Sequence, residues 1–237
     1  MENAINFSVG VILPAAGSGE RLGNDPPKQY YEIQGKPLFL YAVEALENIP
    51  WVVQIVLVSD NVEKMQSILT KRKRKTIDKV TVIKGGSTRH RSIQAGLKTI
   101  TESAGRCEIL VVHDAVRPLV PVALLKQLVQ TAYSGTGAAG LTRPLISTVL
   151  CTDQDSFLAE TLDRSKFLNS ETPQAFKTSV LSEAYQKVEE LERGTECLQL
   201  VLKHCGVRAK LLEGNDDLWK VTIPRDLHSA IGCITGK

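Results

Sequence analysis

The sequence predicts an α/β fold, a mostly parallel sheet flanked by helices, and three observations support it. Short apolar runs rich in valine and isoleucine recur along roughly the first 140 residues, as buried strands do. Segments with the apolar spacing of amphipathic helices separate these runs. A glycine-rich loop follows the first run, where open α/β sheets place ligand-binding loops. Strands alternating with helices imply parallel βαβ units with right-handed crossovers.

The expected strands are apolar and rich in β-branched residues. The run at 52–58 is typical, because it holds four valines and an isoleucine. Strands are predicted on this basis at 9–13, 52–58, 80–83, 109–112, 137–141 and 207–212, with a further β-like segment at 219–222.

The expected helices follow from apolar residues three and four positions apart. Val62, Met65 and Ile68 have this spacing in one segment, and Ile93 and Leu97 have it in another. Helices are predicted at 61–75, 92–100, 122–133, 179–192 and 195–205, and after Pro224.

Residues 143–170 break the alternation of strand and helix. Two β-rich runs flank the polar turn at 153–156, which predicts a hairpin. A lone hairpin is only marginally stable in water. Its apolar residues therefore need a surface to pack on, either in the same domain or in a second subunit.

Length and charge restrict the class of protein. A chain of 237 residues with 43% hydrophobic residues is long enough for one large domain or two small ones with a sizeable core. The net charge is +3, but five cations lie in the run 71–75, and the rest of the chain is slightly acidic. We expect that run to end a solvated helix, because cations favour a helix C-terminus, and we expect no nucleic-acid partner.

Cysteines and hydropathy indicate the compartment. The five cysteines are scattered and lack C-x-x-C spacing, which argues against a disulfide framework and a zinc site. Residues 1–8 do not resemble a signal peptide, and no apolar run approaches the length of a membrane span. The sequence thus predicts a protein of a reducing compartment, the cytosol, with no membrane partner.

The loop after the first strand carries Gly17, Gly19 and Gly23 together with Arg21 and Lys28. Glycines allow backbone N–H groups to approach a phosphate, and the two cations supply charge. The loop therefore predicts a nucleotide phosphate site, although a glycine-rich surface turn with solvated cations is the alternative.

Neither common phosphate fingerprint fits this loop. In the dinucleotide motif the third glycine would come one residue earlier, and Pro26-Pro27 disfavours the helix that should follow. The P-loop pattern G-x-x-x-x-G-K-[ST] is absent from the loop. An NAD-dependent dehydrogenase is consequently a remote alternative.

Two further segments follow predicted strands at the same edge of the sheet. Residues 85–92 combine paired glycines with a helix start, which attracts anions, and residues 113–118 carry Asp114 and Arg117. Each segment alone also fits a capped helix or an internal ion pair, and His113 fits a packing role better than that of a base. Arg164 and Lys220 add cations later in the chain. Cations and glycine amides around one edge suit phosphoryl or nucleotidyl transfer, where positioning and charge stabilisation do most of the catalysis.

Five words occur in order along the chain: L-P-A-A-G-S-G-E-R-L-G…P-P-K-Q, G-G-S-T-R-H-R-S-I, V-H-D-A-V-R-P, E-T-P-Q-A-F and W-K-V-T. In these words the chain resembles the 2-C-methyl-D-erythritol 4-phosphate cytidylyltransferase family, from about Val9 to Ile231. The resemblance implies one Rossmann-like nucleotidyltransferase domain over 1–237. It also implies a protruding β-hairpin arm at about 143–170 that forms a homodimer.

The same resemblance implies the reaction of CTP with a polyol phosphate, with Mg²⁺ as cofactor, and it implies the roles of individual residues. No side chain is assigned as a metal ligand. Catalytic roles fall to Arg21, Lys28, Arg164 and Lys220. CTP binding falls to Pro14, Ala15, Ala16, Gly17, Gly86, Ser87, Arg89, Ser92 and Ala115. Polyol-phosphate binding falls to Asp114, Arg117, Thr148 and Thr195, with Thr148 and Arg164 reaching the partner subunit's substrate.

One departure bears on the substrate. Bacterial members usually read Thr-Asp-Glu-Ala where this chain has Gly194-Thr195-Glu196-Cys197, which leaves the register of Thr195 open. This word resembles the animal branch, whose members make CDP-ribitol for dystroglycan glycosylation and usually carry a second, C-terminal domain. The expected substrate is therefore D-ribitol 5-phosphate. Methylerythritol 4-phosphate is the alternative, and a non-catalytic paralogue is a remote one.

Overall fold

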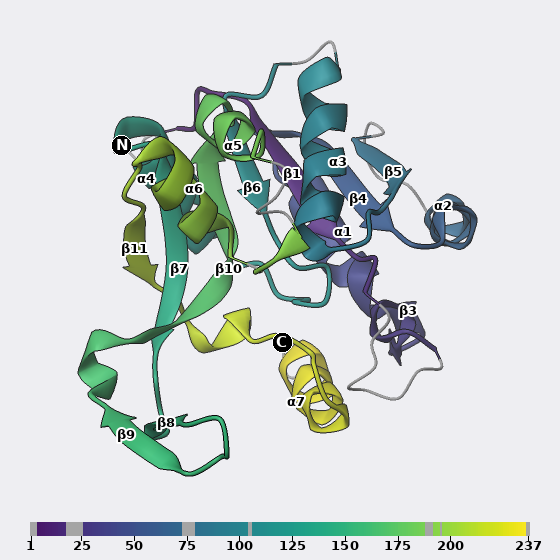
Figure 1. Cartoon of the computed structure of the whole chain (residues 1–237). Helices are drawn as coiled ribbons and strands as arrows, with labels where there is room; N and C mark the ends of the chain where they lie inside the picture. The colour runs from purple at the N-terminus through teal and green to yellow at the C-terminus, as the bar shows by residue number, and fades with distance from the viewer. Residues whose placement is uncertain are drawn as a thin grey trace.

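A seven-stranded sheet in the order β11–β7–β10–β6–β1–β4–β5 forms the centre of the molecule (Figure 1). The computed structural model describes residues 4–17, 26–72, 79–103, 106–187, 192–194 and 196–235. The strands of the sheet are β1 (Val9–Pro14), β4 (Val52–Ser59), β5 (Val80–Lys84), β6 (Ile109–Val112), β7 (Ala138–Pro144), β10 (Leu168–Lys177) and β11 (Lys210–Glu213). Two small sheets pair β2 (Glu32–Ile33) with β3 (Lys36–Pro37) and β8 (Val149–Thr152) with β9 (Leu158–Leu162).

Helices cover both faces of the sheet. Their bounds are α1 (Leu38–Glu47), α2 (Val62–Lys71), α3 (Arg89–Glu102), α4 (Val122–Ser134), α5 (Thr178–Ala184), α6 (Cys197–Cys205) and α7 (Pro224–Thr235). Side chains of α3, α5 and α6 share one core cluster, and those of α1 and α4 share another. β1 lies between the two clusters, because Val11 and Leu13 belong to the second and Ile12 to the first.

The predicted fold class is confirmed, and β10 is the strand that the sequence did not reveal. β1 pairs in parallel with β4 and β6, whereas β10 runs antiparallel between β6 and β7. Thr172 and Pro173 interrupt its apolar pattern, and the pairing with β7 shifts register between Glu171 and Gln174. Proline within an apolar run weakens a strand prediction, so the sequence pattern of this segment did not predict a central strand.

Helix α1 was also missed, and one predicted strand is wrong. Helix α1 begins with the apolar run Leu38–Leu40, and its two glutamates, Glu44 and Glu47, lie in its second half, so its sequence shows little helical alternation at the start. The β-like segment at 219–222 is irregular instead. Its alternation reflects packing, since Val221 is buried in a cluster with residues of α7.

The other helices differ from the prediction mainly at their ends. Thr88 caps α3 by accepting a hydrogen bond from the Arg91 amide, so that helix begins three residues earlier than expected. Helix α5 ends at Ala184, well before the predicted residue 192. None of the described helices has both the length and the apolar character that crossing a bilayer requires.

The hairpin predicted at 143–170 is present as β8 and β9, which project away from the main sheet (Figure 1). β7 leads into it and β10 leads out of it. Its apolar side chains are open to solvent, with Ile146 79% and Phe157 72% exposed. We call the segment 145–167 the arm.

Candidate active site

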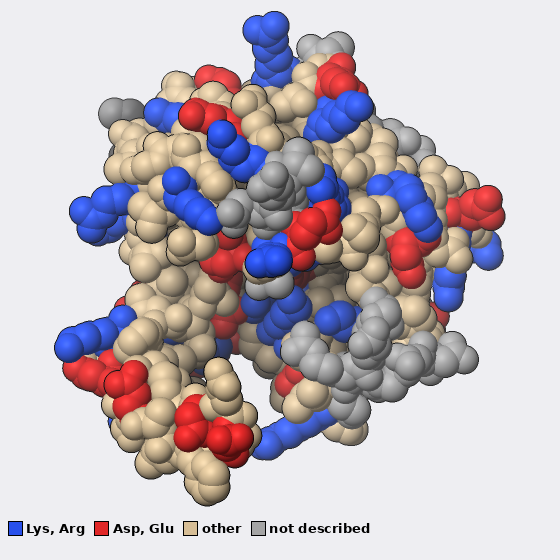
Figure 2. Space-filling view, viewed as in Figure 1, with Lys and Arg blue, Asp and Glu red and all other residues tan. Residues whose placement is uncertain are grey.

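A pocket of about 440 Å³ opens at the carboxyl ends of β1 and β6, beside the first turn of α3. Lys and Arg side chains gather around the hollow in the middle of this face, between the arm and the body of the molecule (Figure 2). The lining residues are Pro14, Ala15, Ala16, Gly17, Lys28, Gln29, Gly86, Ser87, Thr88, Arg89, Ser92, Asp114, Val116 and Lys220. Three segments far apart in sequence thus meet at one edge of the sheet, as predicted, and Lys220 joins them.

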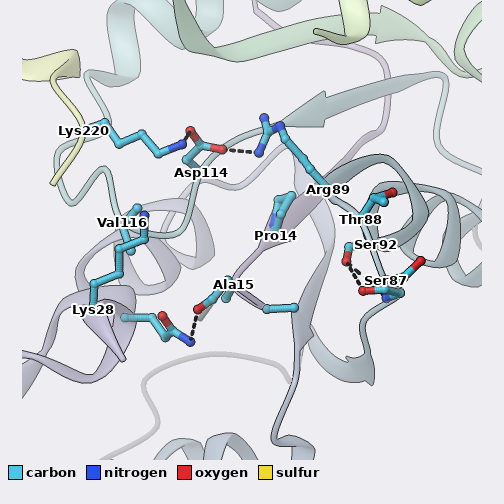
Figure 3. A pocket seen from close by; sticks show the side chains of 14 residues that line it. Pro14, Ala15, Lys28, Ser87, Thr88, Arg89, Ser92, Asp114, Val116 and Lys220 are labelled. Atoms are coloured by element: carbon cyan, nitrogen blue, oxygen red, sulfur yellow. Dashed lines mark hydrogen bonds and ion pairs between the residues drawn. The ribbon is translucent and has the colours of Figure 1, made fainter. Parts of the chain in front are cut away.

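Lys28 reaches the pocket from a one-turn 3₁₀ helix, Lys28–Tyr30. Tyr30 anchors this turn, because its ring packs edge-on against Phe39 and lies 4.1 Å below the Lys64 ammonium. Gln29 donates a hydrogen bond to the Gly17 carbonyl oxygen at 3.4 Å. The turn therefore holds the Lys28 cation opposite α3 (Figure 3).

The first turn of α3 forms the facing wall. A Cβ atom at Gly85 would stand 2.7 Å from the Cβ of Ala16, so only glycine lets the two loops approach this closely. The Gly86 amide donates to Ser92 Oγ at 3.2 Å, which closes the loop onto the helix. The start of a fourteen-residue helix presents backbone N–H groups and a positive dipole end to this wall, which favours an anion.

Asp114 lies at the centre of the pocket's charges. Its Oδ1 is 2.5 Å from Arg89 Nη1, and its Oδ2 is 2.8 Å from Lys220 Nζ (Figure 3). Burial alone would raise the pKa of Asp114, but Arg89, Lys220 and Arg117 hold it far below its usual range. In the same way, burial opposes the charge on Arg89, yet the Asp114 carboxylate raises the pKa of its guanidinium. The Asp114 carboxylate and the Arg89 guanidinium are therefore both charged at physiological pH.

Arg117 lies behind the pocket and does not line it. Its side chain is 7% exposed and contacts the Asp114 carboxylate, the Glu171 carboxylate and the Leu218 carbonyl oxygen. The guanidinium therefore ties the loop after β6 to β10 and to the segment that carries Lys220. In this arrangement Arg117 positions Asp114 and Lys220.

His113 is a neutral packing residue. Burial lowers the pKa of its imidazole to about 4. Its Nε2 lies 3.1 Å from the Arg117 carbonyl oxygen and its Nδ1 lies 3.3 Å from Thr172 Oγ1. That hydroxyl also accepts from the Asp114 amide at 3.1 Å. The sequence interpretation of His113 as a packing residue agrees with this geometry.

The structure brings most of the sequence-derived site residues together. Those that line the pocket are Pro14, Ala15, Ala16, Gly17, Lys28, Gly86, Ser87, Arg89, Ser92, Asp114 and Lys220. Ala115 and Arg117 are buried beside it, whereas Thr148 and Arg164 are exposed residues of the arm. Arg21 and Thr195 lie outside the described residues.

Four residues at or beside the site were not assigned from the sequence. Gln29, Thr88 and Val116 line the pocket, and Glu171 holds Arg117. All four lie within or beside the words that resemble the family, so their position in these words was the sequence feature that could have identified them. The pairing of Glu171 with Arg117 depends on strand β10, which the sequence did not reveal.

The donor set bears on the expected Mg²⁺. Over the residues that the structure describes, no group of three His, Cys, Asp or Glu side chains could hold a metal ion. Asp114 is the carboxylate of the pocket lining, and it is already paired with cations. Mg²⁺ is commonly bound by substrate phosphates with one or two carboxylates at most. The pocket therefore fits a metal that arrives on a nucleotide.

Fold and site together define an α/β domain with a pocket at the carboxyl edge of its sheet, whose lining includes Lys28, Arg89 and Lys220. The chain belongs to the 2-C-methyl-D-erythritol 4-phosphate cytidylyltransferase family, whose model matches residues 9–235. It is 45% identical over 94% of its length to human D-ribitol-5-phosphate cytidylyltransferase, and it covers 51% of that relative. The chain spans about half the length of the animal relatives it matches.

Bacterial relatives match over almost their whole length. The 2-C-methyl-D-erythritol 4-phosphate cytidylyltransferase of Syntrophus aciditrophicus is 34% identical, with 91% of each chain covered. The crystal structure of 4-diphosphocytidyl-2C-methyl-D-erythritol synthase from Anaerococcus prevotii superposes with a TM-score of 0.78 at 24% identity. That match covers 97% of this chain and 96% of the other, and it shows the shared fold.

Proposed function

We propose that this chain is a cytidylyltransferase that transfers CMP from CTP to D-ribitol 5-phosphate and releases pyrophosphate. The observation that carries the proposal is the placement of Lys28 and the Arg89–Asp114–Lys220 cluster on opposite walls of one pocket. Two phosphate-bearing substrates need cations on both sides, and a polyol needs a charged acceptor for its hydroxyls.

Sequence similarity supports the choice of polyol. Animal relatives named D-ribitol-5-phosphate cytidylyltransferase are 43–45% identical to this chain. Bacterial relatives named for methylerythritol phosphate are 31–34% identical. Methylerythritol 4-phosphate is the alternative substrate, because both compounds are short polyol phosphates that present the same charge.

The chemistry is a displacement at the α-phosphorus of CTP. A phosphate oxygen of the polyol phosphate attacks that phosphorus and forms a phosphoanhydride. The bond to the bridging oxygen of pyrophosphate breaks, and pyrophosphate leaves with the electron pair. Lys28 stabilises the negative charge that develops at the α-phosphate, as Arg21 does by family resemblance. Asp114 and Lys220 orient the polyol phosphate, and Arg117 holds both of them in place.

We propose that Mg²⁺ reaches the site bound to CTP. When bound, the metal would offset the negative charge of the substrate phosphates. The pairing of Asp114 with three cations supports a metal held mainly by the nucleotide, rather than by a cage of protein carboxylates.

We further propose a cytosolic homodimer joined through the arm, with Thr148 and Arg164 reaching the partner's site. The exposed apolar side chains of the arm support this assembly, since Leu150 and Leu158 are also more than half exposed. The five cysteines are free thiols, which fits a reducing compartment.

The test is a pyrophosphate-release assay with CTP and each polyol phosphate supplied separately. We expect turnover with D-ribitol 5-phosphate to exceed turnover with methylerythritol 4-phosphate at least tenfold in kcat/KM, and EDTA to abolish it without unfolding the chain. Lys28→Ala should lower this turnover strongly, because it removes a cation of the pocket. Lys98→Ala is its matched control, since Lys98 is 73% exposed on α3 and lies outside the pocket lining. A preference for methylerythritol 4-phosphate would contradict the ribitol assignment, and activity in EDTA would contradict the role of the metal.

A further inference from the structure

A cluster of three buried polar side chains lies behind the α3 wall of the pocket. His90 is in the first turn of α3, Tyr185 follows the last residue of α5, and Cys197 begins α6. Their exposed fractions are 1%, 2% and 0%. None of them lines the pocket, and the proposed reaction does not use them. The cluster also places Cys197, part of the word that departs from the bacterial pattern.

The Tyr185 hydroxyl joins the other two side chains. It lies 2.9 Å from His90 Nδ1 and 3.3 Å from Cys197 Sγ. The imidazole and phenol rings meet edge-on at 5.7 Å between centroids. A hydroxyl can donate one hydrogen bond and accept another, so a single oxygen serves both neighbours whichever way the protons are arranged.

Tyr185 also holds α3 through its backbone. Gln94 Nε2 donates to the Tyr185 carbonyl oxygen at 3.1 Å. Gln94 is four residues beyond His90, so both side chains leave the same face of the helix. One residue thus fastens two successive turns of α3.

The cluster carries no charge of its own. Burial, followed by the charge of Arg89, lowers the pKa of His90, so its imidazole is neutral at physiological pH. Burial raises the pKa of the Cys197 thiol to about 11 and raises that of the Tyr185 hydroxyl. Arg89 is a charged neighbour of these three groups, and its guanidinium pairs with the Asp114 carboxylate.

The turn that Tyr185 fastens is the turn that shapes the pocket wall. Arg89 directly precedes His90, and Ser92 closes the loop at Gly86. The loop packs tightly against the helix, because a Cβ atom at Gly86 would stand 2.4 Å from the Cβ of Arg91. A shift of the first turn of α3 would therefore move Arg89, Ser87 and the backbone amides of the wall together.

We propose that Tyr185 is a positioning residue of the nucleotide site, which it serves through its contacts with His90 and Gln94. Its hydroxyl fixes the first turn of α3 in the orientation that the bound triphosphate requires. This inference rests on the proposed function, in that the ligand of the wall is taken to be CTP.

The decisive variant is Tyr185→Phe, which removes the hydroxyl and keeps the packing of the ring. We expect the Kd for Mg·CTP, measured by calorimetry without polyol phosphate, to rise about tenfold. The thermal midpoint should fall by about 2–4 °C, the shift expected for one lost hydrogen bond in a chain of this size. Cys197→Ser keeps a donor and acceptor beside the phenol and should bind CTP within about twofold of wild type.

Tyr133→Phe is the matched control, because it removes the same hydroxyl group from a tyrosine on α4, whose ring stacks on Phe7. It should leave the Kd for CTP unchanged. If Tyr185→Phe lowers the thermal midpoint but binds CTP as tightly as wild type, the residue is merely structural and the inference is wrong. If wild type itself binds no CTP, the proposed function fails, which the wild-type measurement shows before any variant is compared.

Discussion

The pocket and the arm contrast in where their polar and apolar groups find partners. In the pocket and directly behind it, buried Asp114, Arg117 and His113 are paired with groups of the same chain. In the arm, Phe157 and Ile146 stand largely in solvent, and Asp163 and Arg164 bond only to neighbouring arm residues in the contacts described. One chain completes the internal bonding around the pocket, whereas the apolar side chains of the arm stay exposed.

This difference separates two kinds of evidence about function. Around the pocket, Asp114 pairs with Arg89, Arg117 and Lys220. Removing one of these side chains therefore takes a partner away from a buried charge. The arm instead exposes apolar side chains, a feature typical of interaction surfaces, and only experiment can identify a partner. Variants in the pocket should therefore change stability and chemistry within one subunit, and variants in the arm should act between subunits.

Arg117→Ala tests the internal bonding of the pocket most severely. It leaves the Glu171 carboxylate and the Leu218 carbonyl oxygen without their donor. Breaking a buried pair by removing one partner typically costs several kcal/mol. We expect the free energy of unfolding to fall by about 4 kcal/mol, measured by urea denaturation, and any remaining folded protein to show a raised KM for the polyol phosphate.

The control for this variant is Arg143→Ala, which breaks a pair with Asp216, a side chain that is 98% exposed. Exposed pairs contribute little, so the loss should stay below about 1 kcal/mol. Equal losses for the two arginines would show that the buried bonding around Arg117 is not what distinguishes the pocket.

Lys28→Ala tests the chemical role of the pocket. A cation aimed at developing charge stabilises the transition state more than the ground state. We expect kcat to fall by roughly 100-fold, a loss near 3 kcal/mol, with a much smaller change in the Kd for CTP. A large loss of CTP affinity with unchanged kcat would contradict the catalytic assignment and make Lys28 a binding residue.

His113 makes the pocket sensitive to acid. Its pKa is about 4 in the folded chain against an ordinary value of 6.5, so below pH 6.5 the unfolded chain binds a proton that the folded chain does not. Stability should therefore decline as the pH falls from 6.5 to 4, by about 3 kcal/mol for this group, and the contribution should then level off.

The measurement is the free energy of unfolding against pH, joined to an NMR titration of the imidazole signals. The titration separates His113 from His90, whose pKa burial also lowers. A folded-state titration of His113 near pH 6.5, or a flat stability profile down to pH 4.5, would contradict the prediction.

The sequence predicted those features whose signals lie within a few neighbouring residues. Apolar runs gave β1, β4, β5 and β6, and glycines with cations at strand ends gave the edge of the sheet where the pocket lies. Strand β10 was not predicted, because Pro173 interrupts its apolar pattern and its pairing with β7 shifts register there. The roles of Glu171 and Tyr185 escaped as well, because each depends on contacts between residues that lie far apart along the chain.

Subunit exchange tests the role of the arm. Its expected effect on activity is the smallest of those predicted, because mixing two inactive variants restores only part of the wild-type activity. Arg164 lies on the arm, where its Nη1 donates to the Ile146 carbonyl oxygen at 2.7 Å, and Lys28 lies in the pocket. If each site draws Arg164 from the partner, a mixed dimer of Lys28→Ala and Arg164→Ala chains holds one site with both defects and one with neither.

Mixing the two inactive proteins in equal amounts should therefore restore about one quarter of wild-type activity, because random pairing makes half of the dimers mixed and leaves one intact site in each. Lys166→Ala, another exposed cation of the arm, is the control and should remain active. Exchange is verified by native mass spectrometry of differently labelled chains. A mixture that stays inactive after complete exchange, or a wild-type chain that is active as a monomer, would place Arg164 outside the partner's site and return the arm to a structural role.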